Sequence, residues 1–191
     1  MTSHIRNLAR LDQEDYVWLD KFTIRNLELF GSGNVGAKTL LSVLDNTRTS
    51  MGARLLRRWI ALPLRKVPEI RARLDVVQSL VEQPDMIEEL ACLLNSMCDL
   101  ERIIARVATN RILPRELLQL QKTLEGIVPL KSLCLQSGNE TLVAFANQLN
   151  SCDALREKIE REIQPDASNA VNKGNIIRSG VNAELDELRE L

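Results

Sequence analysis

The chain is poor in aromatic residues and almost lacks histidine. Phe, Trp and Tyr together make up 3% of its 191 residues, and His4 is the only histidine. Its four cysteines, Cys92, Cys98, Cys134 and Cys152, form no C-x-x-C pair. A structural zinc site usually combines closely spaced Cys and His ligands, so the sequence gives no reason to expect one. We expect buried thiols in a reducing cytosol instead.

The chain also lacks long apolar runs and a net charge. No apolar stretch approaches the roughly 20 residues of a membrane span, and residues 1–12 lack the charged head and apolar block of a signal peptide. The 25 Lys and Arg residues are balanced by 26 Asp and Glu residues. No global field therefore draws the chain toward nucleic acid or an anionic membrane. We predict a cytoplasmic protein without membrane contact, in which any DNA role is local or indirect.

Aliphatic residues at helical spacing are what the sequence has in abundance. Hydrophobic residues make up 45% of the chain, enough for one sizeable domain. Apolar positions recur every three or four residues between clear start and stop signals, and no strand-rich stretch competes with them. We therefore predict an all-α, multi-helix domain. The first signals are an Asp20 cap on a helix through Leu29, a helix ending at Pro63, and a helix opened by Pro68 in which Ile70, Leu74, Val77 and Val81 line one face. A helix after Pro84, an Asp99 cap and a helix from Pro114 that is broken or kinked near Gly126 and Pro129 follow. The last signal is an Asn182 cap on a terminal helix that Leu191 cuts short.

One basic concentration stands out in an otherwise balanced chain. It comprises Arg54, Arg57, Arg58, Arg65, Lys66, Arg71 and Arg73, opposed locally only by Glu69. Such a patch can contact phosphates, although a solvated or interdomain face is the commoner role. We name Arg54, Arg57, Arg58, Arg65 and Lys66 as candidates for weak phosphate contacts.

Trp59 lies among these arginines and also among Leu55, Leu56 and Ile60. Stacking on a base would require an exposed ring, whereas a core role requires none. We predict that Trp59 is buried, so that Trp59→Ala costs about 3 to 5 kcal/mol.

A glycine-rich segment invites a nucleotide-binding interpretation. Gly31 to Gly36 matches G-x-G-x-x-G, but it lacks the preceding strand and the acidic residue about twenty positions on that this fingerprint needs. A phosphate loop would place Lys directly after Gly36, and Ala37 intervenes before Lys38. We predict a connecting loop and no cofactor site.

Several stretches, in the same order, resemble the MutS family of DNA mismatch repair proteins, in its bacterial form. The two longest are LDKFTIRNLEL at 19–29 and LLSVLDNTRTSMGARLLRRW at 40–59. Shorter matches follow at 63–64, 70–77, 99–102, 114–117, 176–180 and 184–189. The resemblance places residues 1–174 in the first part of the family's core (lever) domain and residues 175–191 at the truncated start of its lever and clamp segment.

The resemblance implies a core domain that couples mismatched-DNA binding, by clamp and N-terminal domains, to a C-terminal ATPase. The family's mismatch-wedging Phe-x-Glu is absent, because Phe22, Phe30 and Phe145 are followed two positions later by Ile24, Ser32 and Asn147. The family's Walker loop would lie beyond Leu191. We therefore expect no catalytic, cofactor or metal residues here.

For the longer protein, the resemblance implies ATP and Mg²⁺ as cofactors. It implies three kinds of partner: mismatched double-stranded DNA, a second copy of the protein and a MutL-type repair protein. The alternatives from the residues alone are a stand-alone helical protein-interaction module and a small nucleotide-binding enzyme that uses Gly31 to Gly36.

Overall fold

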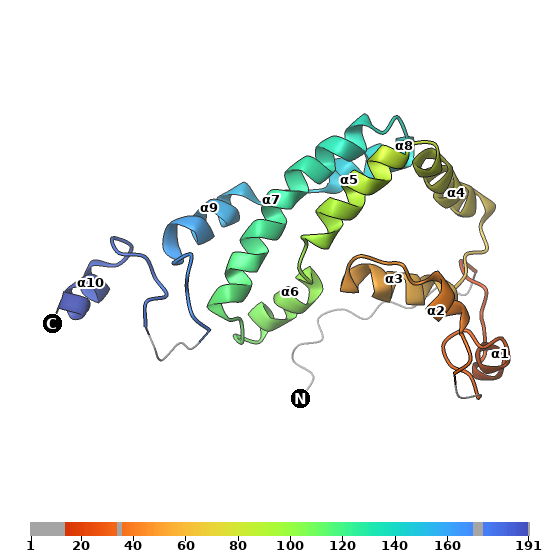
Figure 1. Ribbon diagram of the computed structural model, residues 1–191, viewed down its shortest axis with the longest axis horizontal. Helices are drawn as coiled ribbons and strands as arrows, with labels where there is room; N and C mark the ends of the chain where they lie inside the picture. The colour runs from red at the N-terminus through yellow and green to blue at the C-terminus, as the bar shows by residue number, and fades with distance from the viewer. Residues whose placement is uncertain (1–13, 34–35, 170–173, 191) are drawn as a thin grey trace. The chain divides into compact units, whose positions relative to one another are not determined.

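The regular secondary structure is helical throughout the part of the chain that the computed structural model describes, residues 14–33, 36–169 and 174–190. This confirms the predicted all-α class. Two isolated antiparallel bridges, Tyr16 with Leu64 and Ile163 with Ile177, complete it. The helices, labelled in Figure 1, are α1 (Lys21–Asn26), α2 (Leu40–Leu44), α3 (Ser50–Ala61), α4 (Val67–Val81), α5 (Pro84–Asn95), α6 (Leu100–Ala108), α7 (Pro114–Gln136), α8 (Glu140–Gln148), α9 (Asp153–Glu162) and α10 (Ala183–Glu190).

The described residues form two compact units. The first unit contains residues 14–47 and Gly52–Asp75, and the second contains Arg48–Met51 and residues 76–190. Helix α4 therefore begins in the first unit and ends in the second. The predicted domain boundary between residues 174 and 175 is a different division and stays a prediction.

Three of the described helices start at the caps that the sequence predicts. The Asp20 carboxylate accepts from the Thr23 amide at 2.6 Å, which supplies an acceptor for one of the unpaired N–H groups in the first turn of α1. Asp99 does the same for the Arg102 amide at 3.2 Å, and Asn182 for the Leu185 amide at 3.1 Å. Helix α1 nevertheless ends at Asn26 and not at Leu29, because the backbone turns left-handed at residue 28, with φ of 49°.

The first unit buries little. Leu29 is the only residue of its described part that is buried, at 6% exposure. The predicted α4 helix is present, but Leu74, Val77 and Val81 of its predicted apolar face are all exposed. Val76 and Leu80, on another side of the helix, pack against the core of the second unit instead. Periodicity detects an apolar helix face, but the packed neighbours decide which face is covered.

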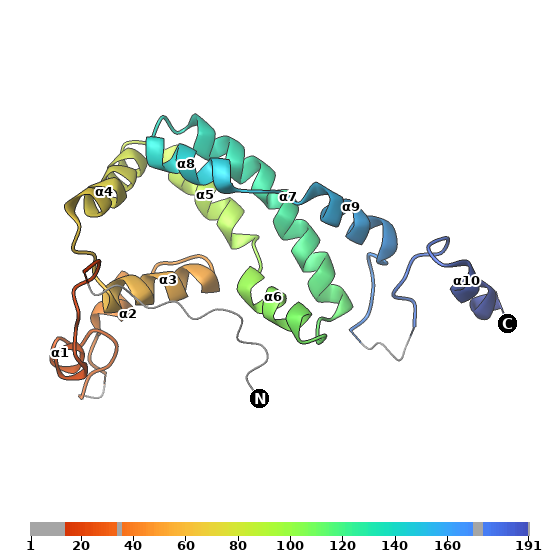
Figure 2. The same ribbon diagram turned by 180° about the vertical axis from the view of Figure 1, so that it is seen from behind.

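The second unit is organised around α7, which contacts α5, α6, α8 and α9 (Figures 1 and 2). Pro114 occupies its first turn, where a missing N–H costs nothing. The helix then runs unbroken for 23 residues, so a break near Gly126 and Pro129 is wrong, while the kink predicted there as the alternative stays a prediction. Pro129 removes one backbone donor, and the buried side chains Ile127 and Cys134 on either side of it keep the helix packed.

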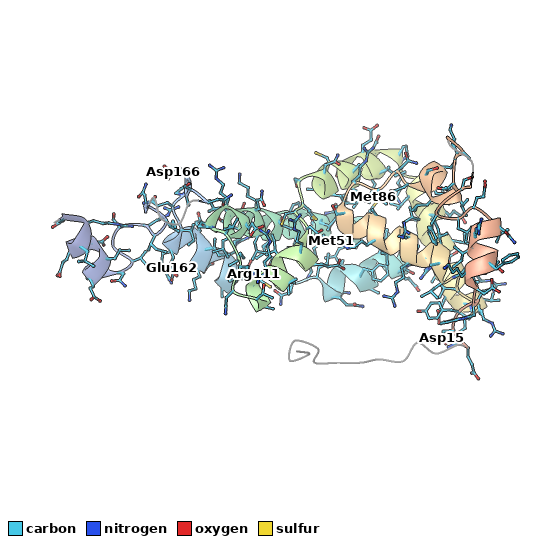
Figure 3. The ribbon with its side chains drawn as sticks, turned by 90° about the horizontal axis from the view of Figure 1, so that it is seen from below. Asp15, Met51, Met86, Arg111, Glu162 and Asp166 are labelled. Carbon is cyan, nitrogen blue, oxygen red and sulfur yellow. The ribbon has the colours of Figure 1, made fainter. Side chains whose placement is uncertain are left out.

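Two buried clusters lie along α7. Met86 of α5, labelled in Figure 3, packs with Cys134 of α7 and with Leu142 and Ala146 of α8. Ile159, Ile163 and Ala167 form the other cluster, against Leu117, Leu118 and Leu120 of α7 and against Ile176 and Ile177. One cluster thus packs other helices against the C-terminal part of α7, and the other packs α9 against its N-terminal part.

The thiols divide between core and surface. Cys134 is buried, Cys98 is half-buried, and Cys92 and Cys152 are exposed, so the expectation of four buried thiols is wrong. Desolvation raises the pKa of the Cys134 thiol. Cys92 lies on the solvent side of α5 and Cys152 in the turn before α9, positions that apolar patterning does not reveal. None of the helices described here is long and apolar enough to cross a membrane.

Candidate nucleic-acid interface

Three of the five candidate phosphate contacts share one face of α3. Arg54, Arg57 and Arg58 stand at positions i, i+3 and i+4, which places them on the same side of the helix, and all three are exposed. Arg58 lies in the last turn, where a cation interacts favourably with the helix C-terminus. The structure therefore groups three of the seven residues of the predicted cluster into one cationic face.

Two arginines of the basic region lie over aromatic rings. The Arg57 guanidinium is 4.5 Å from the centroid of the Phe30 ring, and the Arg73 guanidinium is 3.7 Å from the centroid of Trp59. Such cation–π contacts are worth about 0.5 to 1 kcal/mol at exposed sites. They place each guanidinium over a ring at the surface of the first unit.

The prediction that Trp59 is buried is wrong, because 41% of its surface is exposed. Arg73 covers one part of the ring, and no buried cluster includes it. The helical spacing of Trp59 with Leu55 is real, but Leu55 is exposed as well. The surface of the first unit, rather than its core, accommodates this tryptophan.

Arg65 and Lys66 lie in the extended segment between α3 and α4. The Lys66 ammonium is 2.5 Å from the Asp15 carboxylate. The Arg65 amide donates to the Asp15 carbonyl at 3.1 Å, and the Val17 amide donates to the Pro63 carbonyl at 2.7 Å. Asp15 thus partly neutralises the basic region, although Glu69 is the only acid within it in the sequence.

Arg65 also lines a shallow hollow of about 400 Å³ with Tyr16, Val17 and Trp18. Trp18 is exposed. An arginine beside an exposed aromatic ring can bind an anionic partner.

The residues on either side of the glycine-rich segment are not arranged as they are around a phosphate loop. Asn34 and Val35, within the motif, lie outside the described residues. Before it comes helix α1 and not a strand, and the Ser32 hydroxyl donates to the Glu28 carboxylate at 2.5 Å. After it, Thr39 and Ser42 form a capping box that engages the N-terminal amides of the five-residue α2. Lys38 precedes this cap.

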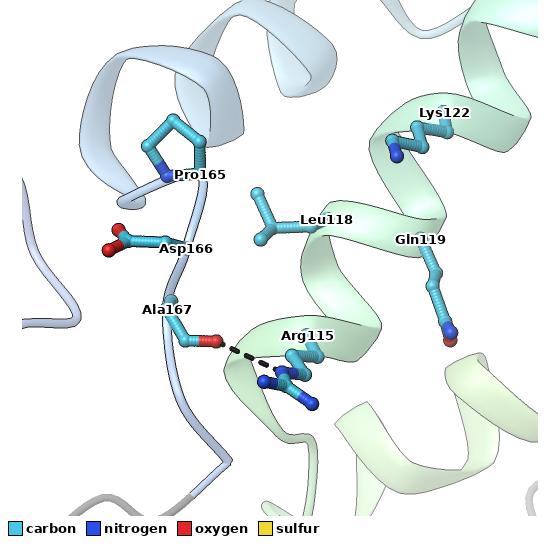
Figure 4. A pocket seen from close by; sticks show the side chains of 7 residues that line it. All are labelled: Arg115, Leu118, Gln119, Lys122, Pro165, Asp166 and Ala167. Atoms are coloured by element: carbon cyan, nitrogen blue, oxygen red, sulfur yellow. Dashed lines mark hydrogen bonds between the residues drawn. The ribbon is translucent and has the colours of Figure 1, made fainter. Parts of the chain in front are cut away.

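A second hollow, of about 320 Å³, lies in the second unit between α7 and the segment after α9 (Figure 4). Arg115 crosses it and donates from Nε to the Ala167 carbonyl at 3.3 Å. Lys122 and Asp166 contribute charges of opposite sign. Within the described residues, no group of three or more His, Cys, Asp or Glu side chains could hold a metal ion, and His4 lies outside them.

Sequence reasoning located the α3 face but missed the groups that organise the basic region. Phe30 and Asp15 are 27 and 51 positions from their partners Arg57 and Lys66. Patterns among neighbouring residues do not predict contacts between residues so far apart in the sequence. An aromatic residue beside a run of arginines, such as Trp59, is the one signal that could have suggested a cation–π arrangement.

Comparison with known proteins shows the family to which the chain belongs. Residues 22–191 match the family model described as MutS domain III. The chain is 47% identical to the DNA mismatch repair protein MutS of Christiangramia forsetii and to that of Phocaeicola vulgatus, and 45% identical to that of Flavobacterium johnsoniae. Each alignment covers 188 residues, which is 98% of this chain and 22% of the relative. The chain therefore spans about a fifth of the length of these relatives.

Proposed function

Because the chain belongs to the MutS family and corresponds to domain III of its members, we propose that it couples mismatched-DNA binding to ATP hydrolysis within a longer repair protein. In this proposal, clamp and N-terminal domains hold the DNA and a C-terminal domain hydrolyses ATP with Mg²⁺. The longer protein acts in the cytoplasm as a homodimer and engages a MutL-type partner. This chain supplies the connecting body and no catalytic residue.

The observation that supports coupling is the unbroken helix α7. A continuous helix of 23 residues contacts four other helices and packs against a buried cluster toward each of its ends. Packed helical elements of this kind can carry energetic coupling between distant sites. The cluster of α5 and α8 at one end and that of α9 at the other are thus joined by a single element.

The test is to soften α7 without removing a buried contact. Glu125 and Val128 are exposed positions near its middle. Replacing both by Gly weakens the helix by roughly 1 kcal/mol per position relative to Ala. In a full-length MutS protein that carries this domain, we expect the double Gly variant to lose most of the stimulation of ATPase activity by mismatched DNA.

The double Ala variant at the same two positions is the matched control, since it removes the same side chains and keeps the helix. Mismatch affinity and basal ATPase activity should be equal in the two variants. Stimulation that is also equal in the two would refute a coupling role for α7.

For the cationic face of α3 we propose weak contacts with DNA phosphates, made without preference for a mismatch. Arg54, Arg57 and Arg58 can each neutralise a phosphate, and the net charge of the whole chain, -1, adds no general attraction to DNA. Replacing all three by Ala should reduce the slope of log Kobs against log salt by up to about 3 for duplex DNA. Arg111→Ala, which removes an exposed arginine of the second unit, should reduce it by less than 1.

Equal slopes for the triple variant and the unmodified chain would contradict the phosphate contacts. Tenfold tighter binding to mismatched than to matched duplex would contradict the assignment of mismatch recognition to other domains. Neither result would bear on coupling through α7, which is measured as ATPase stimulation.

A further inference from the structure

The segment after α9 folds back and pairs with the end of that helix. The Gln164 amide donates to the Ile176 carbonyl at 2.8 Å, and the Arg178 amide donates to the Glu162 carbonyl at 2.9 Å. The Arg178 guanidinium adds a bond from Nε to the Ile163 carbonyl at 2.9 Å. Ile163 belongs to the buried cluster on α7, and the partly buried Ile177 packs against that cluster. Residues 176–178 are therefore anchored on the body of the second unit.

Helix α10 follows this anchored segment and buries none of its residues. Two of its side chains reach back to the anchored segment. The Asp186 carboxylate accepts from the Gly180 amide at 2.6 Å, and Arg189 donates from Nη2 to the Ile177 carbonyl at 2.9 Å. Arg189 also donates from Nη1 to Asp186 at 3.2 Å, so the two side chains hold each other.

This arrangement explains why an aspartate and an arginine stand three positions apart on α10. The i,i+3 spacing puts both on one face of the helix, toward the turn at 177–180. The turn needs a left-handed residue, and Gly180 supplies it with φ of 84°. The planar guanidinium can serve a carbonyl and a carboxylate at once, which a lysine ammonium cannot do in the same geometry.

We propose that Asp186 and Arg189 are positioning residues that form a latch, and that this latch fixes the direction of α10 relative to α9 and α7. Because the helix buries nothing, its direction depends on these polar bonds more than on packing. The role of the latch in coupling rests on the function proposed above, since α10 would then pass its movements to α7 through Ile177. The latch itself does not depend on that function.

The test is amide hydrogen exchange of the chain, followed residue by residue by NMR. Asp186→Asn removes the charge from the bond to Gly180, and we expect the Gly180 amide to exchange roughly tenfold faster. Glu184→Gln is the matched control, because Glu184 also lies in the first turn of α10 and its loss weakens the same interaction with the helix N-terminus. Glu184→Gln should leave Gly180 within about twofold of the parent, and exchange at Ile159 should be unchanged in every variant if the body stays folded.

Arg189→Lys and Arg189→Gln separate geometry from charge. Both should speed Gly180 exchange, because neither side chain can hold Asp186 and the Ile177 carbonyl together. If Arg189→Lys restores the parental rate, or if Asp186→Asn matches Glu184→Gln, the latch is refuted.

Direction is measured with spin labels at Lys158→Cys on α9 and Glu187→Cys on α10, in chains whose Cys92 and Cys152 are Ser. The distribution of label distances should broaden in Asp186→Asn and in Arg189→Gln, but not in Glu184→Gln. An unchanged distribution in the two latch variants would overturn the proposal. Neither readout uses DNA or ATP, so the outcome is independent of the coupling experiment.

Discussion

Thr123 is the polar side chain whose removal should reveal how the turn between α5 and α6 is held on α7. It is 1% exposed. Its hydroxyl accepts from the Cys98 amide at 3.0 Å and donates to the Gln119 carbonyl at 2.9 Å. The hydroxyl also lies 3.0 Å from the Cys98 Sγ. Thr123→Val keeps the shape of the side chain and removes all three contacts, so the free-energy costs of lost apolar burial and of a cavity, which accompany a truncation, do not enter.

The expected loss of unfolding free energy depends on which hydrogen bonds remain available to the Gln119 carbonyl and the Cys98 amide. The Gln119 carbonyl keeps the intrahelical bond that α7 provides. The Cys98 amide loses its acceptor, and a buried donor left without a partner costs about 1 to 3 kcal/mol. Because Cys98 is only half-buried, water can reach part of this site, and we expect about 1 to 2 kcal/mol.

The assay is urea denaturation combined with exchange at the Cys98 amide. Thr123→Val should lower the urea midpoint with an unchanged slope and should speed exchange at Cys98. Thr123→Ser is the control, because it also loses stability, through a missing methyl group, but should leave the Cys98 amide protected. A Thr123→Val chain with the parental midpoint and parental exchange at Cys98 would refute the reasoning.

Further predictions concern single positions. Gly126→Ala should stabilise the chain by about 0.5 to 1 kcal/mol in urea, because α7 continues through it and an added Cβ would lie 3.6 Å from the Met97 methyl, an ordinary contact; a lower midpoint would show strain there. Trp59→Ala should cost about 2 kcal/mol in the same assay, less than full burial would give, because 41% of the side chain is exposed; a cost above 3 kcal/mol would restore the core assignment. Cys134 should react with iodoacetamide at pH 8 more slowly than Cys92, because burial raises its thiol pKa and the thiolate is the nucleophile; equal rates would contradict this. Hydrogen bonds from Thr23 lower the pKa of Asp20, so the stabilising effect of the Asp20 carboxylate is present above about pH 4 and is lost as the pH falls through the lowered pKa. Asp20→Asn should remove this contribution to the pH dependence of the unfolding free energy. A pH profile that is unchanged in the variant would argue against the cap.

The sequence predicted the features that depend on near neighbours. The caps at Asp20, Asp99 and Asn182 were predictable because each carboxylate or amide bonds an amide three positions away. Pro114 was predictable as a helix start for the same local reason. The family was predictable because long motifs occur in a fixed order.

The errors arose where a distant residue decides the outcome. Which side of α4 is covered depends on the core of the second unit, which Val76 and Leu80 contact. Trp59 lies at the surface under Arg73, although its helical spacing resembles that of a core residue. The α3 face was recognisable as basic, but its organisation by Phe30 was not, because 27 positions separate that ring from Arg57.

The order of helices around α7 has a consequence for how the second unit folds. The helices that contact α7 are its neighbours in the chain: α5 and α6 directly precede it, and α8 and α9 directly follow. Most loops that must close to build this unit are therefore short, and helical domains with mainly local contacts fold in microseconds to milliseconds. The bond between Gln83 and the Ser137 carbonyl, 54 positions apart, spans one of its longer loops. We expect this body to assemble soon after α9 leaves the ribosome, ahead of any element that depends on residues synthesised later.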